Sequence, residues 1–229
     1  MHGAGSIADI HAGAEAGSER IDQVLAGEIF DVLDQRGDRV WGRARRDGTV
    51  GWMDAGALAE GAPLATHRVA SVSAALPLNA FVVGAAPGVA GDALTPVGDF
   101  ADDPVAVAES LLGVPHRLGA RSSVATDCSG LVQQALYACG RAGPRHSDQQ
   151  AELGVAIDRA QAGRGDIVVW LSGPDEHRWT GHSAFMLDAD RLIHATGHHG
   201  AVTIEDLGEA EARYRDGGFT APLFRRLKP

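Results

Sequence analysis

The first third of the chain alternates apolar and polar positions in short runs, which is typical of β-strands. Residues 1–60 have this pattern, and it is clearest in VWGRARRDGTVGWM (40–53), where two apolar runs flank Asp47-Gly48. An Asp-Gly pair between two such runs is a strong short-range signal of a β-hairpin. The apolar side chains that we expect in the core of a small barrel are Val40, Trp41, Val50 and Trp52.

Residues 61–100 are rich in Ala, Gly and Pro and contain short apolar pieces such as AFVVG (80–84). Two interpretations stay open for them, a connector and a degenerate second β-module. The predicted organisation is a β-domain over 1–63, this connector or module over 64–100, and a larger domain over 101–229.

The pattern changes after residue 101 from strand-like to helical. The segment DDPVAVAESLLG (102–113) predicts a helix that has Asp103 as its N-cap and Pro104 in its first turn. Gly113 is placed to end this helix.

A second helix is predicted over TDCSGLVQQALYACG (126–140), after a loop over 119–125. Thr126 or Asp127 is its expected cap, and Gly140 its expected stop. Strand-like runs follow at DIVVWL (166–171), HSAFML (182–187), RLIHA (191–195) and APLFRRL (221–227). Helices followed by several strands indicate an α+β fold.

Composition and charge exclude some partners. The chain has 229 residues and a formal net charge of −10, whereas nucleic-acid binding requires clustered Lys and Arg. No apolar run approaches the roughly 20 residues that cross a bilayer, so no membrane partner is expected. The start of the chain shows no secretory signal, which favours a cytoplasmic location, or a periplasmic or secreted one if a leader has been removed.

The two cysteines cannot bond to each other. Cys128 and Cys139 lie on the same predicted helix, about 16 Å apart along its axis, and a disulfide requires Cα atoms roughly 4.4–6.8 Å apart. Cys139 falls in the apolar stripe of that helix, so we expect a buried, inert thiol there.

Cys128 has a different environment, at the N-terminus of the predicted helix. Free amides and the helix dipole favour an anion there, which predicts a lowered thiol pKa, and the same amides suit a developing oxyanion. The alternative is a small apolar residue packed under the first turn.

A nucleophilic thiol requires a histidine beside it. Of the ten histidines, His182 and His194 lie in strand-like runs. A three-residue loop over 188–190 places both on one face of a hairpin, whereas a two-residue loop places them on opposite faces. The alternative for each is a hydrogen-bonded strand residue. His198 and His199 are expected in a surface turn, since no zinc signature fits their spacing.

Four short motifs resemble the NlpC-type cysteine peptidases, papain-like enzymes that cut bacterial cell-wall peptides. They are DCSGLV, GDIVVW, GHSAFML and LIHA, in the order and spacing of that family, and the resemblance covers about residues 101–229. It implies a papain-like catalytic domain in which Cys128 is the nucleophile, His182 the general base and His194 the residue that orients it.

Other segments match this family more loosely. In GVPHRLGARSS (113–123), His116 and Leu118 stand where the family usually has tyrosine and tryptophan, and GTVGWM (48–53) resembles part of a bacterial SH3 domain. The insertion SGPDEHRWT (172–180) is either a lid or a surface insertion. The resemblance implies substrate contacts for Asp127, Ser129, His116, Arg121, Arg145 and Ser147.

The Asp127 carboxylate is expected to pair with the free amine of an N-terminal L-alanine. Its alternative role is helix capping alone, and the alternative for Arg145 and Ser147 is a solvated loop.

The function implied by the resemblance is hydrolysis of the γ-D-glutamyl to diamino-acid bond of peptidoglycan stem peptides. The stem peptide is the expected partner, and no metal or organic cofactor is implied. The alternatives are an amidase or acyltransferase that uses the same thiol, and an inactive module that binds wall peptides.

Overall fold

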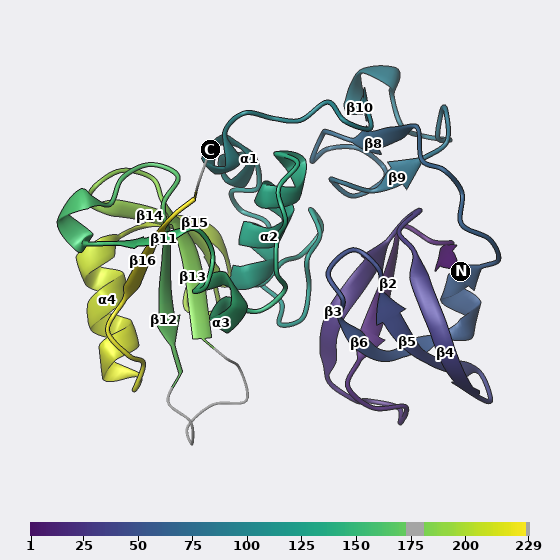
Figure 1. The fold of residues 1–229 in the computed structure, drawn as a ribbon, viewed down its shortest axis with the longest axis horizontal. Helices are drawn as coiled ribbons and strands as arrows, with labels where there is room; N and C mark the ends of the chain where they lie inside the picture. Colours follow the sequence, from purple (N-terminus) through teal and green to yellow (C-terminus); the bar gives the residue numbers. More distant parts are fainter. Residues whose placement is uncertain (173–180, 228–229) are drawn as a thin grey trace. The chain divides into compact units, whose positions relative to one another are not determined.

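The computed structural model describes residues 1–172 and 181–227, and the chain folds into two compact units. The first unit contains residues 1–100 and the loop 117–125, and the second contains residues 101–116 and the chain from Thr126 onward (Figure 1). The loop that precedes Cys128 therefore belongs to the first unit. Of the predicted lid or insertion over 172–180, only Ser172 lies within the described residues, so this prediction stays open.

The first unit, all of whose residues are described, is built on a five-stranded antiparallel sheet of order β3-β2-β6-β5-β4. A two-stranded pair, β1 with β7, accompanies it. The bounds are β1 His2–Gly3, β2 Ile7–His11, β3 Arg20–Leu25, β4 Phe30–Arg36, β5 Arg39–Ala44, β6 Val50–Asp54, the 3-10 helix η1 Ala55–Ala57, and β7 Leu58–Ala59.

The predicted hairpin at Asp47-Gly48 is confirmed, because β5 and β6 pair on either side of it. Gly48 has φ +87°, a left-handed conformation that glycine adopts at little cost. The predicted barrel core is only partly correct, as shown by the exposed fractions of the side chains. Val40 is 2% exposed and pairs with Met53, which is fully buried, whereas Val50 is 42% exposed.

Strand alternation explains this difference, since each pair across β5 and β6 points to the face opposite its neighbours. Trp41 pairs with Trp52, and both are half-buried on the face away from Val40. The tryptophans therefore cover the outside of the barrel, and Met53 takes the core position that was predicted for Trp52.

Residues 64–100 carry a small antiparallel sheet of order β10-β8-β9. Leu25 and Ala26 of the barrel pack with Val69 and Ala80 in one apolar cluster, so this sheet shares a core with the barrel. The elements are β8 His67–Val69, β9 Phe81–Val82, the 3-10 helix η2 Gly91–Ala93, and β10 Leu94–Pro96.

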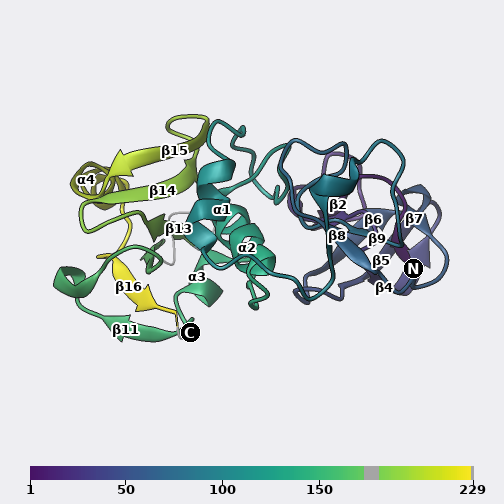
Figure 2. The ribbon, with the colours of Figure 1, turned by 90° about the horizontal axis from the view of Figure 1, so that it is seen from above.

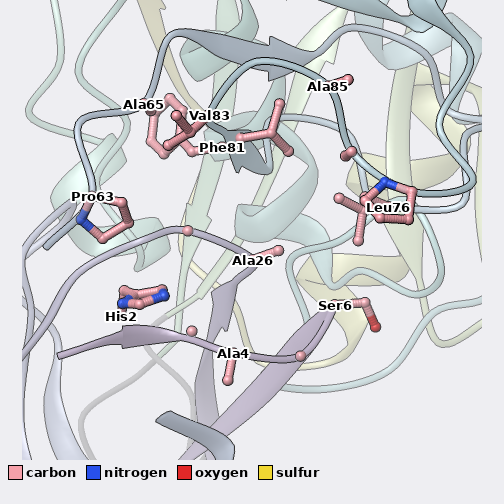
Figure 3. A pocket seen from close by; sticks show the side chains of 16 residues that line it. His2, Ala4, Ser6, Ala26, Pro63, Ala65, Leu76, Phe81, Val83 and Ala85 are labelled. Carbon is pink, nitrogen blue, oxygen red and sulfur yellow. The ribbon is translucent and has the colours of Figure 1, made fainter. Parts of the chain in front are cut away.

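A cavity of about 410 Å³ opens in the first unit, between its N-terminal strands and this small sheet (Figure 3). His2, Ala26 and Phe81 are part of its lining, together with backbone and small side chains. The candidate site residues lie elsewhere, outside this lining.

The second unit contains, within its described residues, a six-stranded antiparallel sheet of order β11-β16-β12-β13-β14-β15. Helices α1, α2 and α3 lie on one side of this sheet and α4 on the other (Figures 1 and 2). The bounds are α1 Pro104–Ser110, α2 Cys128–Ala138, α3 Ser147–Gln150, β11 Val155–Ile157, η3 Arg159–Gln161, β12 Ile167–Leu171, β13 Gly181–Met186, β14 Arg191–Thr196, β15 Ala201–Asp206, α4 Leu207–Asp216 and β16 Leu223–Arg226. No helix in the described part of the chain is long and apolar enough to cross a membrane.

Both predicted helices are present. Asp103 caps α1 by accepting a hydrogen bond from the Val105 N–H, and Asp127 caps α2 by accepting one from the Gly130 N–H. The apolar stripe predicted for α2 is too narrow, because residues 129–138 are all buried.

Cys139 was predicted to be buried, but it is half-exposed. It forms the C-cap of α2, where the helix ends and turns toward the surface at Gly140. The four predicted strands correspond to β12, β13, β14 and β16, whereas α3, β11, β15 and α4 were not predicted.

Candidate active site

Cys128 is the first residue of α2. Its Sγ lies 3.9 Å from the Ser147 hydroxyl oxygen, and the backbone N–H groups of Ser183 and Ser129 also face the sulfur. Ser183 directly follows His182 on β13. These contacts place the predicted nucleophile beside the strand that carries the predicted base.

The pKa of the Cys128 thiol is raised above its ordinary value, opposite to the predicted direction. Although the residue as a whole is only partly buried, burial of the sulfur is the largest cause, and the charge of Asp127 adds to it. The backbone N–H groups and the Ser147 hydroxyl lower the pKa but are outweighed. The resting thiol is therefore protonated at neutral pH, and its reaction requires a base.

This protonation state predicts how the alkylation of Cys128 varies with pH. In a Cys139→Ala variant, which leaves Cys128 as the remaining thiol, the rate with iodoacetamide should rise about tenfold per pH unit up to about pH 8.5, the ordinary cysteine pKa. The rate is measured by mass spectrometry between pH 5.5 and 9. A plateau below pH 7 would contradict the prediction, because it would mark a resting thiolate.

The hairpin of β13 and β14 has the register of a three-residue loop. Phe185 pairs with Ile193, and the Leu187 N–H donates to the Arg191 carbonyl at 2.8 Å, which leaves residues 188–190 as the loop. Of the two registers that the sequence left open, the structure has the one that places both candidate histidines on one face of the hairpin.

The two histidine rings are in contact. His182 Nε2 lies 2.9 Å from His194 Nδ1, and the ring planes are nearly perpendicular, at 88°. Both side chains are buried, and His194 is completely inaccessible. The predicted contact between the rings is therefore confirmed.

Both histidines are neutral at neutral pH. The pKa of His182 lies well below its ordinary value because of burial, followed by the charges of His194, His116 and Arg213. Burial also lowers the pKa of His194, although the Glu205 carboxylate opposes this shift. A neutral His182 is in the form that can accept a proton.

A carboxylate that was not predicted extends this chain of polar groups. Glu205 of β15 has Oε2 2.9 Å from His194 Nε2, and Arg213 of α4 binds the same carboxylate through Nη1 to Oε1 and through Nη2 to Oε2 at 2.6 Å. Burial opposes the ionisation of Glu205, but hydrogen bonds from His194 and Arg213 outweigh it and hold the pKa well below its usual range. Glu205 is thus an ionised acceptor.

Tyr214, also not predicted, fixes the plane of the His182 ring. The two rings stack with their centroids 4.4 Å apart and their planes 24° apart. Trp170 packs against Tyr214 in turn, at a centroid distance of 4.8 Å. The rotation of His182 is therefore restricted by aromatic packing as well as by His194.

The sequence does contain a signal for the helix that carries Arg213 and Tyr214. Asp206 is an N-cap residue, and the apolar residues Leu207, Ala210 and Tyr214 follow at helical spacing. This signal predicts α4 but does not predict that its last turn reaches the histidines.

Asp127 combines capping with an ion pair. Its two oxygens accept from Arg145 Nη1 and Nη2 at 3.0 and 2.7 Å, and Oδ1 also accepts from the Ser129 hydroxyl at 3.3 Å. All three side chains are buried, with exposed fractions of 6%, 2% and 6% for Asp127, Arg145 and Ser129. The solvated-loop alternative for Arg145 is wrong, since its guanidinium supports the cap of α2.

Ser147 is also buried, so the solvated-loop alternative is wrong for it as well. Its hydroxyl lies 2.9 Å from the Ser183 hydroxyl, which donates to Gln150 Oε1 at 2.7 Å. These bonds hold α3 against β13 beside the Cys128 sulfur.

His116 lies near the two histidines. Its charge contributes to the lowered pKa of His182, and its backbone forms a bridge with Thr126, two residues before Cys128. His198 and His199 lie in a turn as predicted. Within residues 1–172 and 181–227, no group of three or more His, Cys, Asp or Glu residues is arranged to hold a metal.

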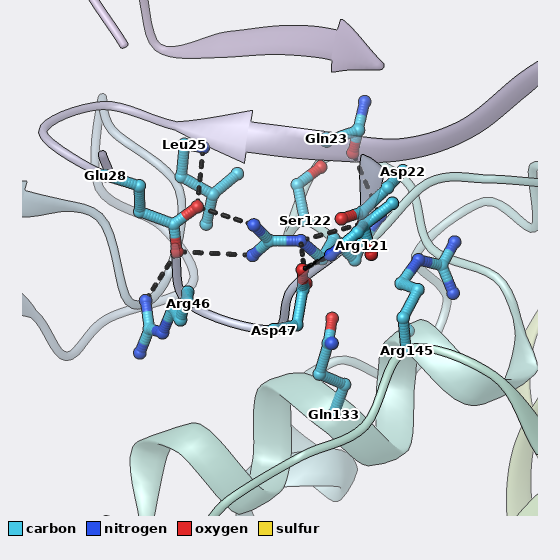
Figure 4. Close-up of polar contacts among 12 residues, drawn as sticks. Asp22, Gln23, Leu25, Glu28, Arg46, Asp47, Arg121, Ser122, Gln133 and Arg145 are labelled. Carbon is cyan, nitrogen blue, oxygen red and sulfur yellow. Dashed lines mark hydrogen bonds and ion pairs between the residues drawn. The ribbon is translucent and has the colours of Figure 1, made fainter. Parts of the chain in front are cut away.

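Arg121 belongs to the first unit and is completely buried there. Its guanidinium binds Glu28 at 2.5 and 3.2 Å and Asp22 at 3.0 Å, and Asp47 lies 3.8 Å away (Figure 4). Arg46 binds Glu28 from the other side at 2.6 Å. This placement gives the predicted substrate contact of Arg121 no support, because the charge is already satisfied by buried carboxylates.

Two family matches cover most of the chain. Residues 113–218 match the NlpC/P60 family, and residues 10–58 match the bacterial dipeptidyl-peptidase SH3 domain. The first match includes Cys128, His182 and His194, and the second covers most of the N-terminal barrel.

Two curated relatives are each similar over 45% of this chain. Peptidoglycan endopeptidase RipB of Mycobacterium tuberculosis is 30% identical in an alignment 116 residues long that covers 45% of this chain and 46% of that protein. Gamma-D-glutamyl-L-lysine dipeptidyl-peptidase of Bacillus cereus is 29% identical over 105 residues, which are 45% of this chain and 31% of that protein. The chain thus spans less than half the length of these relatives.

A solved structure resembles the whole chain. The crystal structure of an NlpC/P60 family protein from Bacillus cereus has a TM-score of 0.82, covers 98% of both chains and is 17% identical. This likeness confirms the predicted α+β fold, with a papain-like domain preceded by an SH3-like barrel.

Proposed function

Because the chain belongs to the NlpC/P60 family and carries a bacterial SH3 domain ahead of its peptidase domain, we propose that it is a cysteine endopeptidase acting on peptidoglycan peptides. The finer proposal is that it cuts the bond between the γ-carboxyl of D-glutamate and a diamino acid, in stem peptides with a free N-terminal L-alanine.

One observation carries this proposal. A protonated Cys128 thiol lies at the start of a helix, next to the strand of a neutral His182 whose Nε2 is held by His194 at 2.9 Å. A nucleophile, a base and a group that orients the base are the parts that acyl transfer through a thiol requires.

The chemistry follows from these parts. His182 takes the Cys128 proton while the sulfur attacks the amide carbonyl, and amides at the N-terminus of α2 stabilise the tetrahedral oxyanion. The amine leaves with the proton from His182, and water then hydrolyses the thioester. Aromatic stacking on Tyr214 keeps the ring in place during both proton transfers.

Two comparisons support the choice of bond. The SH3 match is to the domain of bacterial dipeptidyl-peptidases, and one relative is named for γ-D-glutamyl-L-lysine cleavage. Asp127 and Ser129 lie beside the nucleophile in sequence, and we assign them the free amine of L-alanine. Arg145 binds the same carboxylate, so the amine is expected to share Asp127 with this guanidinium.

Mass spectrometry of L-Ala-γ-D-Glu-diamino-acid tripeptides and tetrapeptides tests this proposal. We expect release of L-Ala-D-Glu and a new free amine on the diamino acid. Acetylation of the N-terminus should slow cleavage about tenfold or more, because it removes a charge-assisted hydrogen bond of about 1.5–3 kcal/mol.

Other outcomes contradict specific parts of the proposal. Equal rates on free and acetylated peptides would remove the amine-binding role of Asp127. Transfer of the acyl group to an added amine, without hydrolysis, would indicate the acyltransferase alternative, and binding without any cleavage would indicate the inactive module.

A further inference from the structure

The row of polar side chains formed by His182 and His194 continues to a carboxylate, that of Glu205. We infer that Glu205 is a positioning residue, which sets the tautomers of His194 and His182 so that His182 Nδ1 keeps a free lone pair for the Cys128 proton. The tautomers are a property of the resting protein, whereas the catalytic consequence rests on the proposed function.

Arg213 sets the direction of these hydrogen bonds, because it can act only as a donor. A guanidinium donates hydrogen bonds and never accepts them, and both of its Nη atoms bind the Glu205 carboxylate. Glu205 is therefore ionised and can only accept. Its Oε2 faces His194 at 2.9 Å, so the proton of that contact must be on the histidine.

His194 then has one possible neutral form. Its Nε2 is buried and makes no well-aligned hydrogen bond within residues 1–172 and 181–227, but a bare lone pair there would lie 2.9 Å from the negative Oε2 of Glu205, so the charge favours a proton on Nε2. With the proton on Nε2, a neutral imidazole has a bare Nδ1, which is an acceptor. Since Nδ1 lies 2.9 Å from His182 Nε2, the proton between the rings must be on His182.

His182 is fixed by the same reasoning. A neutral ring that carries its proton on Nε2 has its lone pair on Nδ1, the nitrogen that is not engaged by His194. That nitrogen is the one available to the thiol. The donor direction, from His182 to His194 to Glu205, is thus imposed by Arg213, three groups away from the base.

The carboxylate also matters after proton transfer. When His182 becomes an imidazolium, its Nε2–H still donates to His194, whose own N–H donates to a negative charge. A neutral side chain in place of Glu205 removes this charge and permits the reverse order of donors. Glutamine is the informative replacement, since Arg213 would hold its carbonyl oxygen and turn its NH₂ group toward His194.

The reversed order would disable the base. In a Glu205→Gln variant, an amide that donates to His194 Nε2 moves the His194 proton to Nδ1, and that proton then requires His182 Nε2 as its acceptor. His182 would carry its proton on Nδ1 and have no lone pair for Cys128.

The first test reads the tautomers without substrate. We expect the ¹⁵N shifts of histidine-labelled protein near pH 7.5 to show the Nε2–H form for both His182 and His194, assigned by comparison with His182→Gln and His194→Gln variants. In Glu205→Gln, both should change to the Nδ1–H form. An Nδ1–H form of either ring in the unmodified protein would overturn the inference, even if no variant folds.

The second test is kinetic. Glu205→Gln should lower kcat on the stem tripeptide by about 100-fold with KM nearly unchanged, a smaller loss than removal of a directly bonded triad carboxylate causes. Glu205→Asp keeps an ionised acceptor, so both histidines should retain the Nε2–H form. Its kcat should be at least about tenfold higher than that of Glu205→Gln. Glu211→Gln is the matched control. Glu211 is also bound by an arginine, Arg159, but it is not part of the contacts among His182, His194 and Glu205.

The outcomes separate the inference from the proposed function. Unchanged tautomers or unchanged kcat in Glu205→Gln, or equal losses in Glu205→Gln and Glu205→Asp, would overturn the positioning role. The expected tautomers in a protein that cleaves no stem peptide would support the inference and reject the function.

Discussion

Cys128→Ala is expected to reduce peptide hydrolysis by at least about 10⁴-fold without loss of the fold. The sulfur is the atom that would form the acyl-enzyme, and loss of a nucleophile leaves only binding and oxyanion stabilisation. The substitution removes one sulfur, which accepts backbone N–H groups and contacts Ser147. It does not change Asp127, which caps α2, so the helix should still form. The measurement is kcat/KM on the stem tripeptide, with circular dichroism as the check of folding.

Cys139→Ala is the matched control for this prediction. It makes the same substitution at the other end of the same helix, at a half-exposed position outside the candidate site. We expect its kcat/KM to stay within about twofold of the unmodified protein. Residual hydrolysis above about one per cent in a folded Cys128→Ala variant would reject Cys128 as the nucleophile.

Arg121→Met is expected to lower the free energy of unfolding of the first unit by about 3–5 kcal/mol. Arg121 is fully buried and binds Glu28 and Asp22. Methionine would remove this positive charge and leave buried carboxylates whose negative charge is no longer fully compensated. The lowered pKa of Glu28, caused by Arg121 and Arg46 against the opposing effect of burial, shows that this carboxylate is charged in the folded state. Urea unfolding followed by the fluorescence of Trp41 and Trp52 measures the loss.

Arg117→Met, in the same loop but exposed, is the control and should change the stability by less than about 0.5 kcal/mol. A double variant, Arg121→Met with Glu28→Gln, should be less destabilised than the sum of the single variants, because it removes both charges of the strongest pair. A loss below about 1 kcal/mol for Arg121→Met would mean that the cluster does not stabilise the unit.

The predicted parts of the site depended on local rules. The period of two along a strand limited His182 and His194 to two arrangements, and the three-residue loop seen in the structure selects the one with both on one face. Helix capping also depends on neighbouring residues: Asp103 was predicted as the cap of α1, and Asp127 is one of the two caps expected for α2.

The parts that were missed depend on contacts between segments far apart in the chain. A helix N-terminus lowers the pKa of a thiol only if burial and nearby charges do not outweigh it, and at Cys128 both do. Glu205 lies 11 residues after His194, and the pairing of β14 with β15 brings it diagonally across from the ring, because Glu205 pairs with Leu192, two residues before His194. Sequence spacing predicts neither how deeply a sulfur is buried nor which strand pairs with the strand that carries a histidine.

The membership of loop 117–125 in the first unit has a consequence for modularity. The chain passes between the units three times, after residues 100, 116 and 125, so no single cut yields two intact modules. A truncation that starts at Ala101 would keep Arg121 but remove Glu28 and Asp22. The guanidinium, which is buried in the intact chain, would then lack these counter-ions. Any transplant of the peptidase domain therefore has to carry its barrel or redesign that loop.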